Sequence, residues 1–291
     1  MTKIIAIGIK IVDISSNSIV LLLYYRKWYT MAAKIPISDE MLKQMLTFRQ
    51  KNKLSYEEIG RRFKISSQTV KRNLLKVADE EELDATHKFN EHYFYEIDSA
   101  DKAYWLGFIT ADGTVLEQNM SMTLKLTWSD NMHIVKFVNA IQGDFEVSKQ
   151  FHTVTGKPTA YVSIYSDIFV RELVEKMSGF KKENRKPFDV PEKFLCDYIR
   201  GLWDADGCIR HKHIDLSGNF ETCLWTQERL IEFCGIPKTK MGFESNRYRI
   251  YVSRGKIDVL KWMYYPMLNK DTVLERKYKQ AKLLILHSIR R

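Results

Sequence analysis

Cysteine is scarce in this sequence, and no two cysteines form a C-x-x-C pair. Structural zinc sites need closely spaced ligands, so this spacing argues against zinc. No secretory leader is apparent, and disulfide bonds belong mainly to oxidising compartments. We therefore expect reduced cytoplasmic thiols. The four cysteines are Cys196, Cys208, Cys223 and Cys234.

The sequence also lacks an uninterrupted apolar run that would cross a membrane. Its most apolar segment, residues 4–25, contains Lys10, Asp13 and a polar run at 15–18, which a bilayer would bury at considerable cost. We therefore expect no membrane partner. A more polar stretch opens just before the first expected helix, so residues 1–33 are interpreted as an N-terminal extension of uncertain relevance. Mass spectrometry of the native N-terminus tests this hypothesis.

Acidic residues are outnumbered by basic ones, 36 against 46, which gives a net charge of +10. Clustered Lys and Arg favour a polyanionic partner because they release condensed counterions from phosphates. The surplus is local: residues 34–78 contain eleven Lys or Arg against four Asp or Glu. The acidic run DEEELD at 79–84 follows. Runs of like charge are usually solvated and extended, so we predict a linker over 79–94.

Residues 34–78 have the pattern of three short helices. Ser38 is the expected N-cap of the first, Ser55 with Glu58 forms a capping box for the second, and Ser66 or Ser67 caps the third. The run SYEEIGRRFKISSQTVKRNLLK resembles a helix-turn-helix unit, which predicts a small all-α DNA-binding module.

Polar side chains of the third helix lie opposite its apolar stripe, where they would face a DNA major groove. An ordinary three-helix bundle with a solvated basic face is the alternative, and the local basic surplus favours DNA. The base-contact candidates are Ser67, Gln68, Lys71 and Arg72.

The rest of the chain repeats itself. The strings YWLGFITADGTV (104–115) and YIRGLWDADGCI (198–209) are apolar helical runs that end in Ala-Asp-Gly, 94 residues apart. Each is followed by a matching strand and helix, and each half closes with a basic pair. A chance duplication of one short string would not carry those elements with it, so we predict two half-units, 95–190 and 191–291.

The acid of each string lies at the C-terminal end of an expected helix, where the helix macrodipole disfavours negative charge. Gly113 and Gly207 are expected to end the helices. If Gly107 and Gly201 let the helices pack closely, the two carboxylates also repel each other. A divalent cation relieves both penalties, and Mg²⁺ binds through one or two carboxylates plus phosphate oxygens. Ordinary Asp-Gly turns are the alternative.

Both strings resemble the LAGLIDADG motif, and residues 95–291 are similar to two-motif LAGLIDADG homing endonucleases. The resemblance implies an α+β fold of two pseudo-symmetric αββαββα half-units, with the motif helices at their interface and two antiparallel sheets forming a saddle over DNA. It implies a Mg²⁺ or Mn²⁺ site made by the last acids, Asp112 and Asp206, with the backbone carbonyls of Ala111 and Ala205 as further ligands.

The resemblance also implies a catalytic lysine in RKYKQAKLLIL, which is Lys277, and internal symmetry assigns Lys186 to the other half. The implied activity is intron homing: a monomer hydrolyses one phosphodiester on each strand of a long, non-palindromic duplex and leaves short 3′ overhangs. The implied setting is the cytoplasm of a prokaryote, with a phage as another source, or an organelle.

The two copies depart from the motif in different ways. The first has Trp105, Leu106 and Thr110 where the motif prefers Leu, Ala and Asp, and the second has Arg200 at its Ala position. Thr110 against Asp204 makes the halves asymmetric, which suits a non-palindromic site. Arg200 raises the expectation of a looser helix interface.

The strands after each motif carry polar side chains that, by period-two alternation, would share one sheet face and contact base edges. A solvated sheet face is the alternative for each of them. The candidates are Gln118, Lys125, Lys149, Arg210, Lys212, Arg247 and Arg249.

Two other functions remain open at this stage. A non-cleaving DNA-binding regulator on the same fold would be expected to lose an acid, whereas both acids are present. An RNA maturase that assists intron splicing is not distinguished by basic sheets alone. An intein is not expected, because the sequence starts with Met1 and ends in Arg-Arg rather than His-Asn.

Overall fold

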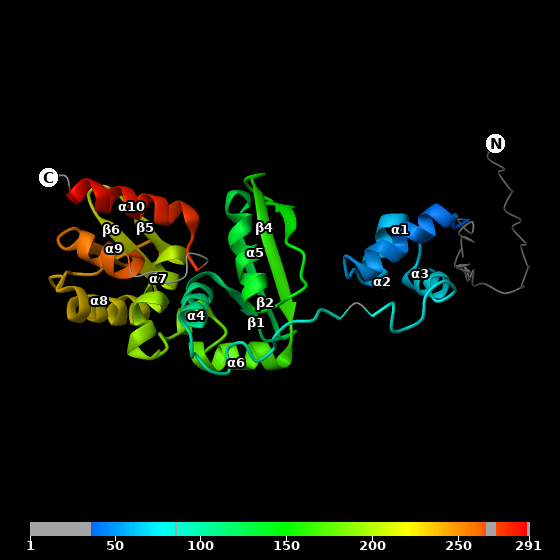
Figure 1. The fold of residues 1–291 in the computed structure, drawn as a ribbon, viewed down its shortest axis with the longest axis horizontal. Helices are drawn as coiled ribbons and strands as arrows, with labels where there is room; N and C mark the ends of the chain where they lie inside the picture. The colour runs from blue at the N-terminus through cyan, green and yellow to red at the C-terminus, as the bar shows by residue number, and fades with distance from the viewer. Residues whose placement is uncertain (1–35, 85, 266–271, 290–291) are drawn as a thin grey trace, which may run out of the picture.

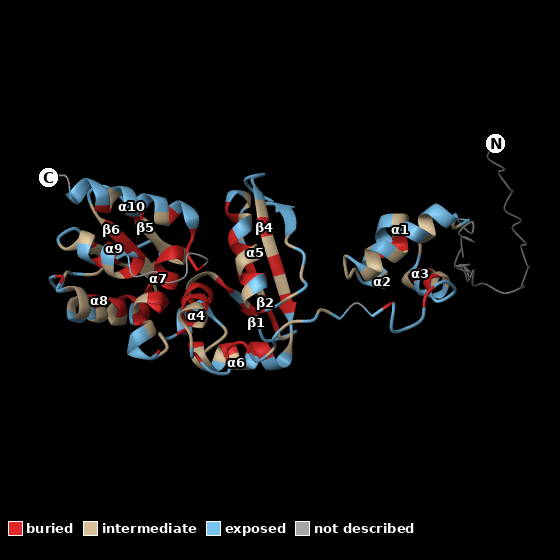
Figure 2. Ribbon diagram, in the orientation of Figure 1, coloured by how far each residue is buried: buried red, intermediate tan, exposed pale blue. Residues whose placement is uncertain are grey.

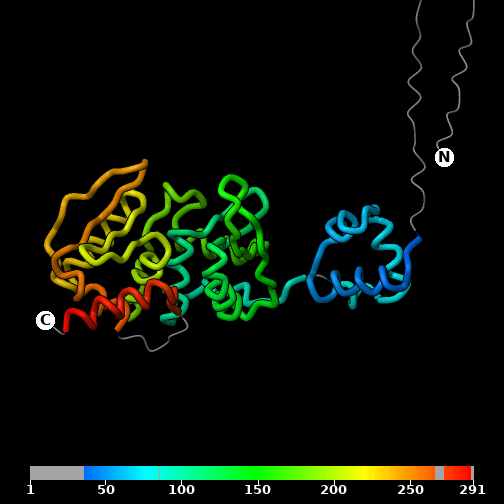
Figure 3. Tube along the Cα trace, turned by 90° about the horizontal axis from the view of Figure 1, so that it is seen from above, coloured from blue at the N-terminus to red at the C-terminus, as the bar shows by residue number. Residues whose placement is uncertain are grey.

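The structure is a computed structural model that describes residues 36–84, 86–265 and 272–289. Figures 1 and 3 both place a small helical module at one end of the molecule and the C-terminal helices at the other. The interpretation of residues 1–33 as an extension lies outside the described residues. Among the helices of the described ranges, none is both long and apolar enough to span a bilayer.

The N-terminal module contains three helices, and side chains cap each one at the residues that the sequence predicts. Ser38 accepts a hydrogen bond from the Met41 amide, and Ser55 and Glu58 form the complete capping box. Ser66, rather than Ser67, caps the third helix. The helices are α1 (Asp39–Gln50), α2 (Tyr56–Phe63) and α3 (Ser67–Leu74).

The turn between α2 and α3 is tight because two residues permit it. Lys64 adopts a left-handed conformation with φ 57°, and the Ile65 amide donates to the Gly60 carbonyl at 2.9 Å. A Cβ on Gly60 would lie 2.6 Å from the Ile65 oxygen, so only glycine fits there. The turn directs the apolar stripes of both helices onto a core around Met45 and Val70, which are fully buried.

The acidic run that follows the module is folded, and the prediction of an extended linker is wrong for residues 79–83. Asp79 accepts from the Glu82 amide at 2.8 Å, and the Leu83 amide donates to the Asp79 carbonyl. Leu83 is buried in the core of the module, and Arg49 donates to its carbonyl at 2.8 Å. The free energy gained by burying one apolar side chain in the core outweighs the mutual repulsion of its solvated acidic neighbours.

The larger body consists of two half-units with the same order of elements, αββαββα, as predicted. The first contains α4 (Ala100–Asp112), β1 (Thr114–Leu116), β2 (Ser121–Thr127), α5 (Asn131–Ala140), β3 (Ser148–Phe151), β4 (Pro158–Tyr165) and α6 (Asp167–Met177). The second contains α7 (Leu195–Asp206), β5 (Gly207–Ile209), β6 (Ile214–Gly218), α8 (Phe220–Cys234), β7 (Gly242–Glu244), β8 (Arg247–Val252) and α9 (Lys256–Tyr264), followed by α10 (Glu275–Ile289).

The two sheets repeat one topology, which confirms the duplication. Both are antiparallel and four-stranded, in the orders β1-β2-β4-β3 and β5-β6-β8-β7. In each sheet, alternate residues point into the core, such as Met122 and Leu124 on β2 and Ile250 and Val252 on β8. Helix α5 packs on the first sheet and α8 on the second, which leaves the other face of each sheet open.

The motif helices α4 and α7 pack against each other in the middle of the larger body, where Figure 2 shows both as largely buried. A Cβ on Gly107 would lie 2.1 Å from the Tyr198 carbonyl oxygen, and one on Gly201 would lie 2.1 Å from that of Tyr104. The predicted close approach of the two helices is therefore confirmed. Two glycines facing two carbonyls set the separation of the half-units.

Arg200 does not loosen this interface, so that expectation is wrong. Its guanidinium is buried inside the second half-unit, where it donates to Asp197 at 2.6 Å and to the Met263 carbonyl at 2.7 Å. It also lies over the Tyr104 ring, 5.4 Å from the ring centre. A buried arginine with paired donors and an aromatic neighbour fills space instead of separating the helices.

Candidate functional site

The two motif acids end the two motif helices. The glycines that follow them have extended backbones, with φ −67° at Gly113 and −89° at Gly207, so neither is there for a left-handed turn. They are required for space: a Cβ would lie 2.7 Å from the Ile109 oxygen at Gly113 and 2.5 Å from the Trp203 oxygen at Gly207. The chain can therefore leave each helix at once and enter a strand.

Asp112 is half-buried at the end of α4. Its Oδ1 lies 3.3 Å from the Nζ of Lys182, which belongs to the short 3₁₀ helix Lys182–Asn184. Burial raises the pKa of Asp112 above its usual 3.8, the Lys182 ammonium opposes this, and the negative charge of Asp206 raises it further. Each acid thus lies within the electrostatic reach of the other.

Asp206 is held by the two terminal nitrogens of one guanidinium. Arg247, at the start of β8, donates to Oδ2 at 2.5 Å and to Oδ1 at 3.2 Å. The hydrogen bond to Asp206 raises the pKa of Arg247, and the charge of Asp112 adds to this effect. Two carboxylates and two basic side chains therefore form one charge cluster, in which Arg247 interacts electrostatically with both acids.

A pocket of about 250 Å³ lies beside this cluster and is lined by both half-units, including Ala111, Lys182, Asp206 and Arg247. Asn219, the N-cap of α8, closes one side of it: its Nδ2 donates across the half-unit boundary to the carbonyls of Lys182 at 3.0 Å and Arg185 at 2.7 Å. The site therefore belongs to the junction of the two halves and not to either half alone.

Lys277 holds the end of α7. Its Nζ is buried and donates to the carbonyls of Trp203, Asp204 and Gly207 at 2.7, 2.6 and 2.7 Å. Burial lowers the pKa of Lys277 to about 8. An ammonium among the last carbonyls of a helix offsets the negative end of the macrodipole.

Arg185 performs the same task for α4. Its guanidinium donates to the carbonyls of Ile109, Thr110 and Gly113 at 3.1, 3.0 and 2.9 Å, and burial lowers its pKa to about 10. These carbonyls lie 94 positions before the three that Lys277 contacts, so Arg185 is its counterpart. The symmetry assignment of Lys186 is therefore off by one residue.

Lys186 is exposed beside this contact. The first half reaches the motif helix through the short 3₁₀ helix and the second through the first turn of α10, so the spacings from the acid differ. Counting residues could not resolve which of the two neighbours is buried. The field that the sequence predicts to be adverse at both acids is also partly offset by the protein itself, through Arg185 and Lys277.

The carboxylates suit a hard divalent cation better than zinc. Within residues 36–84, 86–265 and 272–289, no three His, Cys, Asp or Glu side chains come together as a metal site. Zinc usually takes three or four protein ligands, whereas Mg²⁺ binds through one or two carboxylates and completes its shell with water and phosphate oxygens. Asp112 and Asp206 fit that requirement. Ala111 and Ala205 precede them in the last turn of each helix.

Asp204 is a buried acid with a structural role. In the sequence, it is identified only as a difference from Thr110 of the first copy. It accepts from the hydroxyl of Tyr104 at 2.8 Å, from that of Tyr264 at 2.6 Å and from the Leu274 amide at 2.7 Å. Burial raises its pKa, although Lys277 opposes the rise. Because Tyr104 belongs to α4, Asp204 joins the two half-units. Its counterpart in the first copy, Thr110, donates to the Leu106 carbonyl of its own helix at 2.7 Å.

The open face of the first sheet contains Lys125 but not Lys149. Lys125 stands opposite Tyr161 and donates to Gln150 at 3.2 Å. Lys149 stands opposite the buried Ala160, and its Nζ lies 4.7 Å from the centre of the Trp128 ring, so it points to the helix side. Its assignment to the DNA-facing side is wrong, because β3 alternates one residue out of step with the expectation. Gln118 is exposed in the turn between β1 and β2.

Sequence reasoning missed three polar residues that share this face with Lys125. The alternation of buried residues on β4 would have identified the two that lie on β4, whereas the one on β3 follows only from the pairing of the two strands. The three residues are Gln150, Tyr161 and Ser163.

In the second sheet, two candidates gather around a buried acid that the sequence did not single out. Asp215 on β6 lies 2.9 Å from Arg210 and 3.8 Å from Arg249. Arg249 shares one face of β8 with Arg247, as alternation predicts. Lys212 is exposed in the turn before β6, and its carbonyl accepts from Lys256 at 3.0 Å. The acid keeps the guanidinium groups in fixed positions at the open face.

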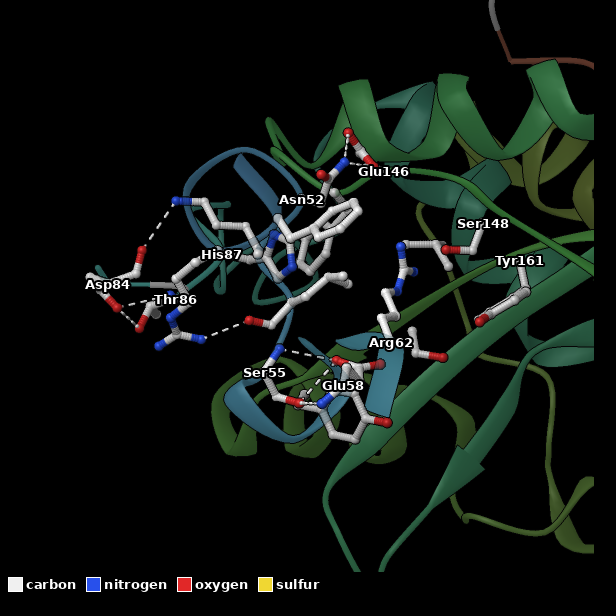
Figure 4. A pocket seen from close by; sticks show the side chains of 18 residues that line it. Asn52, Ser55, Glu58, Arg62, Asp84, Thr86, His87, Glu146, Ser148 and Tyr161 are labelled. Atoms are coloured by element: carbon white, nitrogen blue, oxygen red, sulfur yellow. Dashed lines mark hydrogen bonds between the residues drawn. The ribbon is translucent and has the colours of Figure 1, made fainter. Parts of the chain in front are cut away.

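The α3 candidates lie on a separate surface. Gln68, Lys71 and Arg72 are exposed and Ser67 is half-buried; Lys71 lies 3.9 Å from the exposed Glu80. None of these four lines the groove of about 720 Å³ between the module and the first sheet. That groove is drawn in Figure 4, where Ser55, Glu58 and Arg62 of the module lie across from Ser148 and Tyr161 of the sheet. Asn52 donates to Glu146 at its rim at 2.8 Å.

No protein-family model and no curated protein matches the chain. Among solved structures, the N-terminal LAGLIDADG domain of DUF199/WhiA is similar at 18% identity and a TM-score of 0.40, over 62% of this chain and 91% of that one. Mesophilic variants of the homing endonuclease I-DmoI are similar at 14% identity and a TM-score of 0.44, over 67% and 99%.

The homing endonuclease I-WcaI bound to its DNA recognition sequence is similar at 15% identity and a TM-score of 0.42, over 72% of this chain and 97% of that one. At these identities and TM-scores the likeness concerns the arrangement of elements alone. The function of this chain has to be inferred from its own residues.

Proposed function

We propose that the chain is a metal-dependent endonuclease that hydrolyses one phosphodiester on each strand of a long, non-palindromic DNA duplex. One observation carries the proposal: two carboxylates, Asp112 and Asp206, end equivalent helices that pack against each other at the junction of two half-units. A pair of acids at a surface flanked by two polar sheet faces is suited to a phosphate backbone and a divalent cation.

Asp112 and Asp206 would hold Mg²⁺ or Mn²⁺, with the carbonyls of Ala111 and Ala205 as further ligands. When bound, the cation supplies activation of water and stabilisation of the charge that develops on the phosphate oxygens. Lys182 and Arg247, which contact the acids, are placed to bind the phosphates. Asn219 keeps the pocket assembled by joining the two half-units.

We assign positioning roles to Lys277 and Arg185. Both are buried among backbone carbonyls, so they fix the helix ends that present the acids. Lys186 is exposed and is assigned to contact with the DNA backbone.

The DNA would lie along the open sheet faces and extend to the module. Lys125 and Gln118 would contact it in the first half, and the arginines of β8, with Arg210 and Lys212, in the second. The polar face of α3, with Ser67, Gln68, Lys71 and Arg72, would enter a major groove as in helix-turn-helix proteins. Because one chain supplies both acids and the halves differ, a monomer suffices for a non-palindromic site and for cuts that leave short 3′ overhangs.

A non-cleaving DNA-binding regulator is the second candidate. The observation that favours it is the full pairing of both acids with Lys182 and Arg247, which neutralises them without a metal. The two candidates differ in one outcome: a regulator binds DNA and leaves the backbone intact in Mg²⁺.

The test uses a plasmid that contains the DNA flanking the coding region, joined without the intervening sequence. We expect wild type to linearise it in Mg²⁺ and to stop in EDTA, and Asp112→Asn or Asp206→Asn to reduce the rate by about 100-fold or more. Asp189→Asn, an exposed acid away from the site, is the matched control and should cut normally. Cleavage that continues when both motif acids are replaced refutes the proposal.

A further inference from the structure

Each carboxylate of the site is held by a basic side chain of its own half-unit. Lys182 lies 3.3 Å from Asp112, and Arg247 lies 2.5 and 3.2 Å from the two oxygens of Asp206. The basic side chains are 42% and 43% exposed, whereas the acids are 32% and 15% exposed. The cations therefore lie on the solvent side of the carboxylates and can leave without unfolding the site.

We propose that Lys182 and Arg247 are displaceable counter-ions, which occupy the carboxylates in free protein and move to backbone phosphates when DNA binds. A divalent cation and DNA then bind cooperatively. This inference rests on the proposed function, because it takes Asp112 and Asp206 as the cation ligands.

Charge balance is the first reason. Two carboxylates and two basic side chains are neutral together, so a divalent cation added to the free protein leaves an excess of two positive charges in a partly buried place. Two phosphate groups, one from each DNA strand, remove that excess. The cation should therefore bind tightly only when phosphate is present, and by thermodynamic reciprocity DNA should bind more tightly when the cation is present.

The position of the two basic groups is the second reason. Lys182 and Arg247 line the same pocket of about 250 Å³, one from each half-unit. The backbone at Lys182 is held by Asn219, and Arg247 follows a turn in which Ser245 and Asn246 have φ 51° and 60°. Both backbones are thus fixed, while the ends of the side chains reach solvent. A phosphate in the pocket would therefore lie near two basic side chains, which need only rotate about their side-chain bonds to contact it.

The two counter-ions should differ in strength. A guanidinium that donates twice to one carboxylate holds it more firmly than an ammonium with one contact. Arg247 should therefore be the stronger block to cation binding in free protein, and Lys182 the weaker. This ordering separates displaceable counter-ions from a general effect of positive charge.

The test measures Mn²⁺ binding to DNA-free protein by electron paramagnetic resonance. We expect Arg247→Gln to bind Mn²⁺ about tenfold more tightly than wild type and Lys182→Gln about threefold more tightly. Arg249→Gln is the matched control, because Arg249 shares the face of β8 but pairs with Glu244 and Asp215; its Mn²⁺ affinity should equal that of wild type. Addition of a duplex should tighten Mn²⁺ binding to wild type and change that of Arg247→Gln much less.

Equal or weaker Mn²⁺ binding by Arg247→Gln overturns the inference, as does an equal gain in Arg249→Gln. Replacing both acids by Asn in the Arg247→Gln protein distinguishes a failure of the counter-ion role from a failure of the proposed function. If Mn²⁺ still binds, the acids are not its ligands and the proposed function fails as well. If Mn²⁺ binding depends on the acids but is alike in wild type and Arg247→Gln, the endonuclease proposal stands and only the counter-ion role is lost.

Discussion

The two half-units have the same strand order and the same motif helix, but they neutralise equivalent charges with different groups. In the first half, Asp112 has one contact to Lys182 and the helix end is held by Arg185. In the second, Asp206 has two contacts to Arg247 and the helix end is held by Lys277. The helix ends are therefore held from equivalent places by different residues, whereas the partners of the two acids come from different elements, the short 3₁₀ helix and β8.

This difference indicates which parts of the site depend on geometry and which depend on residue type. The carboxylates and the glycines of the helix contact are the same in both halves. For the glycines the reason is space, because a Cβ would lie 2.1 Å from a backbone oxygen of the opposite helix. The basic groups vary, because a carbonyl cluster or a carboxylate accepts either an ammonium or a guanidinium. Two unlike halves also suit a duplex whose two strands differ.

The largest effect is expected where the halves are most alike, at the helix contact. Gly107→Ala and Gly201→Ala each place a Cβ 2.1 Å from a backbone oxygen of the opposite helix, so we expect the free energy of unfolding to fall by about 4 kcal/mol or more. Gly179→Ala, where the added Cβ has only ordinary contacts beyond 3.4 Å, should change it little. Chemical denaturation measures both, and a mild effect at Gly107 would mean that the helices are not in close contact.

The next effect concerns the groups in which the halves differ. Arg185→Met and Lys277→Met each leave three carbonyls at a helix end without their donor, which should lower the free energy of unfolding by about 3 kcal/mol. Lys277→Arg should recover most of the stability and the cleavage rate, because an arginine already fills the equivalent place. If Lys277→Met keeps normal stability and loses only kcat, Lys277 contacts the reacting groups and its positioning role is wrong.

A smaller effect on stability should appear at acidic pH, and it concerns a contact that joins the two half-units. His133 on α5 lies 3.0 Å from the hydroxyl of Tyr104, which donates to Asp204, and burial lowers the pKa of His133 to about 3. In the unfolded chain the His133 imidazole takes up a proton near pH 6.5, whereas in the folded chain it stays neutral at that pH. The free energy of unfolding therefore falls as pH decreases through this range. We expect a loss of about 2 kcal/mol between pH 7 and pH 5 that His133→Gln removes. Parallel pH profiles for the two proteins would contradict this.

The smallest effect compares the two faces of the first sheet. Lys125→Ala should weaken binding to a duplex by about threefold and reduce the salt dependence by the equivalent of about one phosphate contact. Lys149→Ala should leave both unchanged, because Lys149 lies on the helix side over Trp128. Fluorescence anisotropy across a salt series measures both variants. A larger loss for Lys149→Ala would place the DNA on the other face.

The sequence predicts well what is local or repeated. The caps at Ser38 and Ser55 depend on residues three positions apart, and the αββαββα repeat is visible because both copies keep their register. The sequence predicts poorly which of two adjacent residues occupies a given place in the structure. Lys149 and Lys186 are each adjacent to the residue that occupies the expected place, Gln150 and Arg185, because no pattern fixes the phase of a short exposed strand or of an irregular segment.

The basic partners of the acids were beyond sequence reasoning for a different reason. Lys182 is 70 residues from Asp112, and Arg247 is 41 residues from Asp206, so only the folded chain brings each pair together. Arg247 was predicted as a DNA contact from strand alternation alone. Its hold on Asp206 changes that prediction, since the same side chain now links the sheet face to the site.

The central claim is that Asp112 and Asp206 share a divalent cation at a DNA backbone. Crystals of the protein with its duplex and Mn²⁺, measured for anomalous scattering, test it directly. We expect an anomalous peak within about 2.5 Å of carboxylate oxygens from both residues, with Arg247 turned away from Asp206 toward a phosphate. An ordered duplex with the Arg247 to Asp206 pair intact and no peak between the two acids would contradict the account.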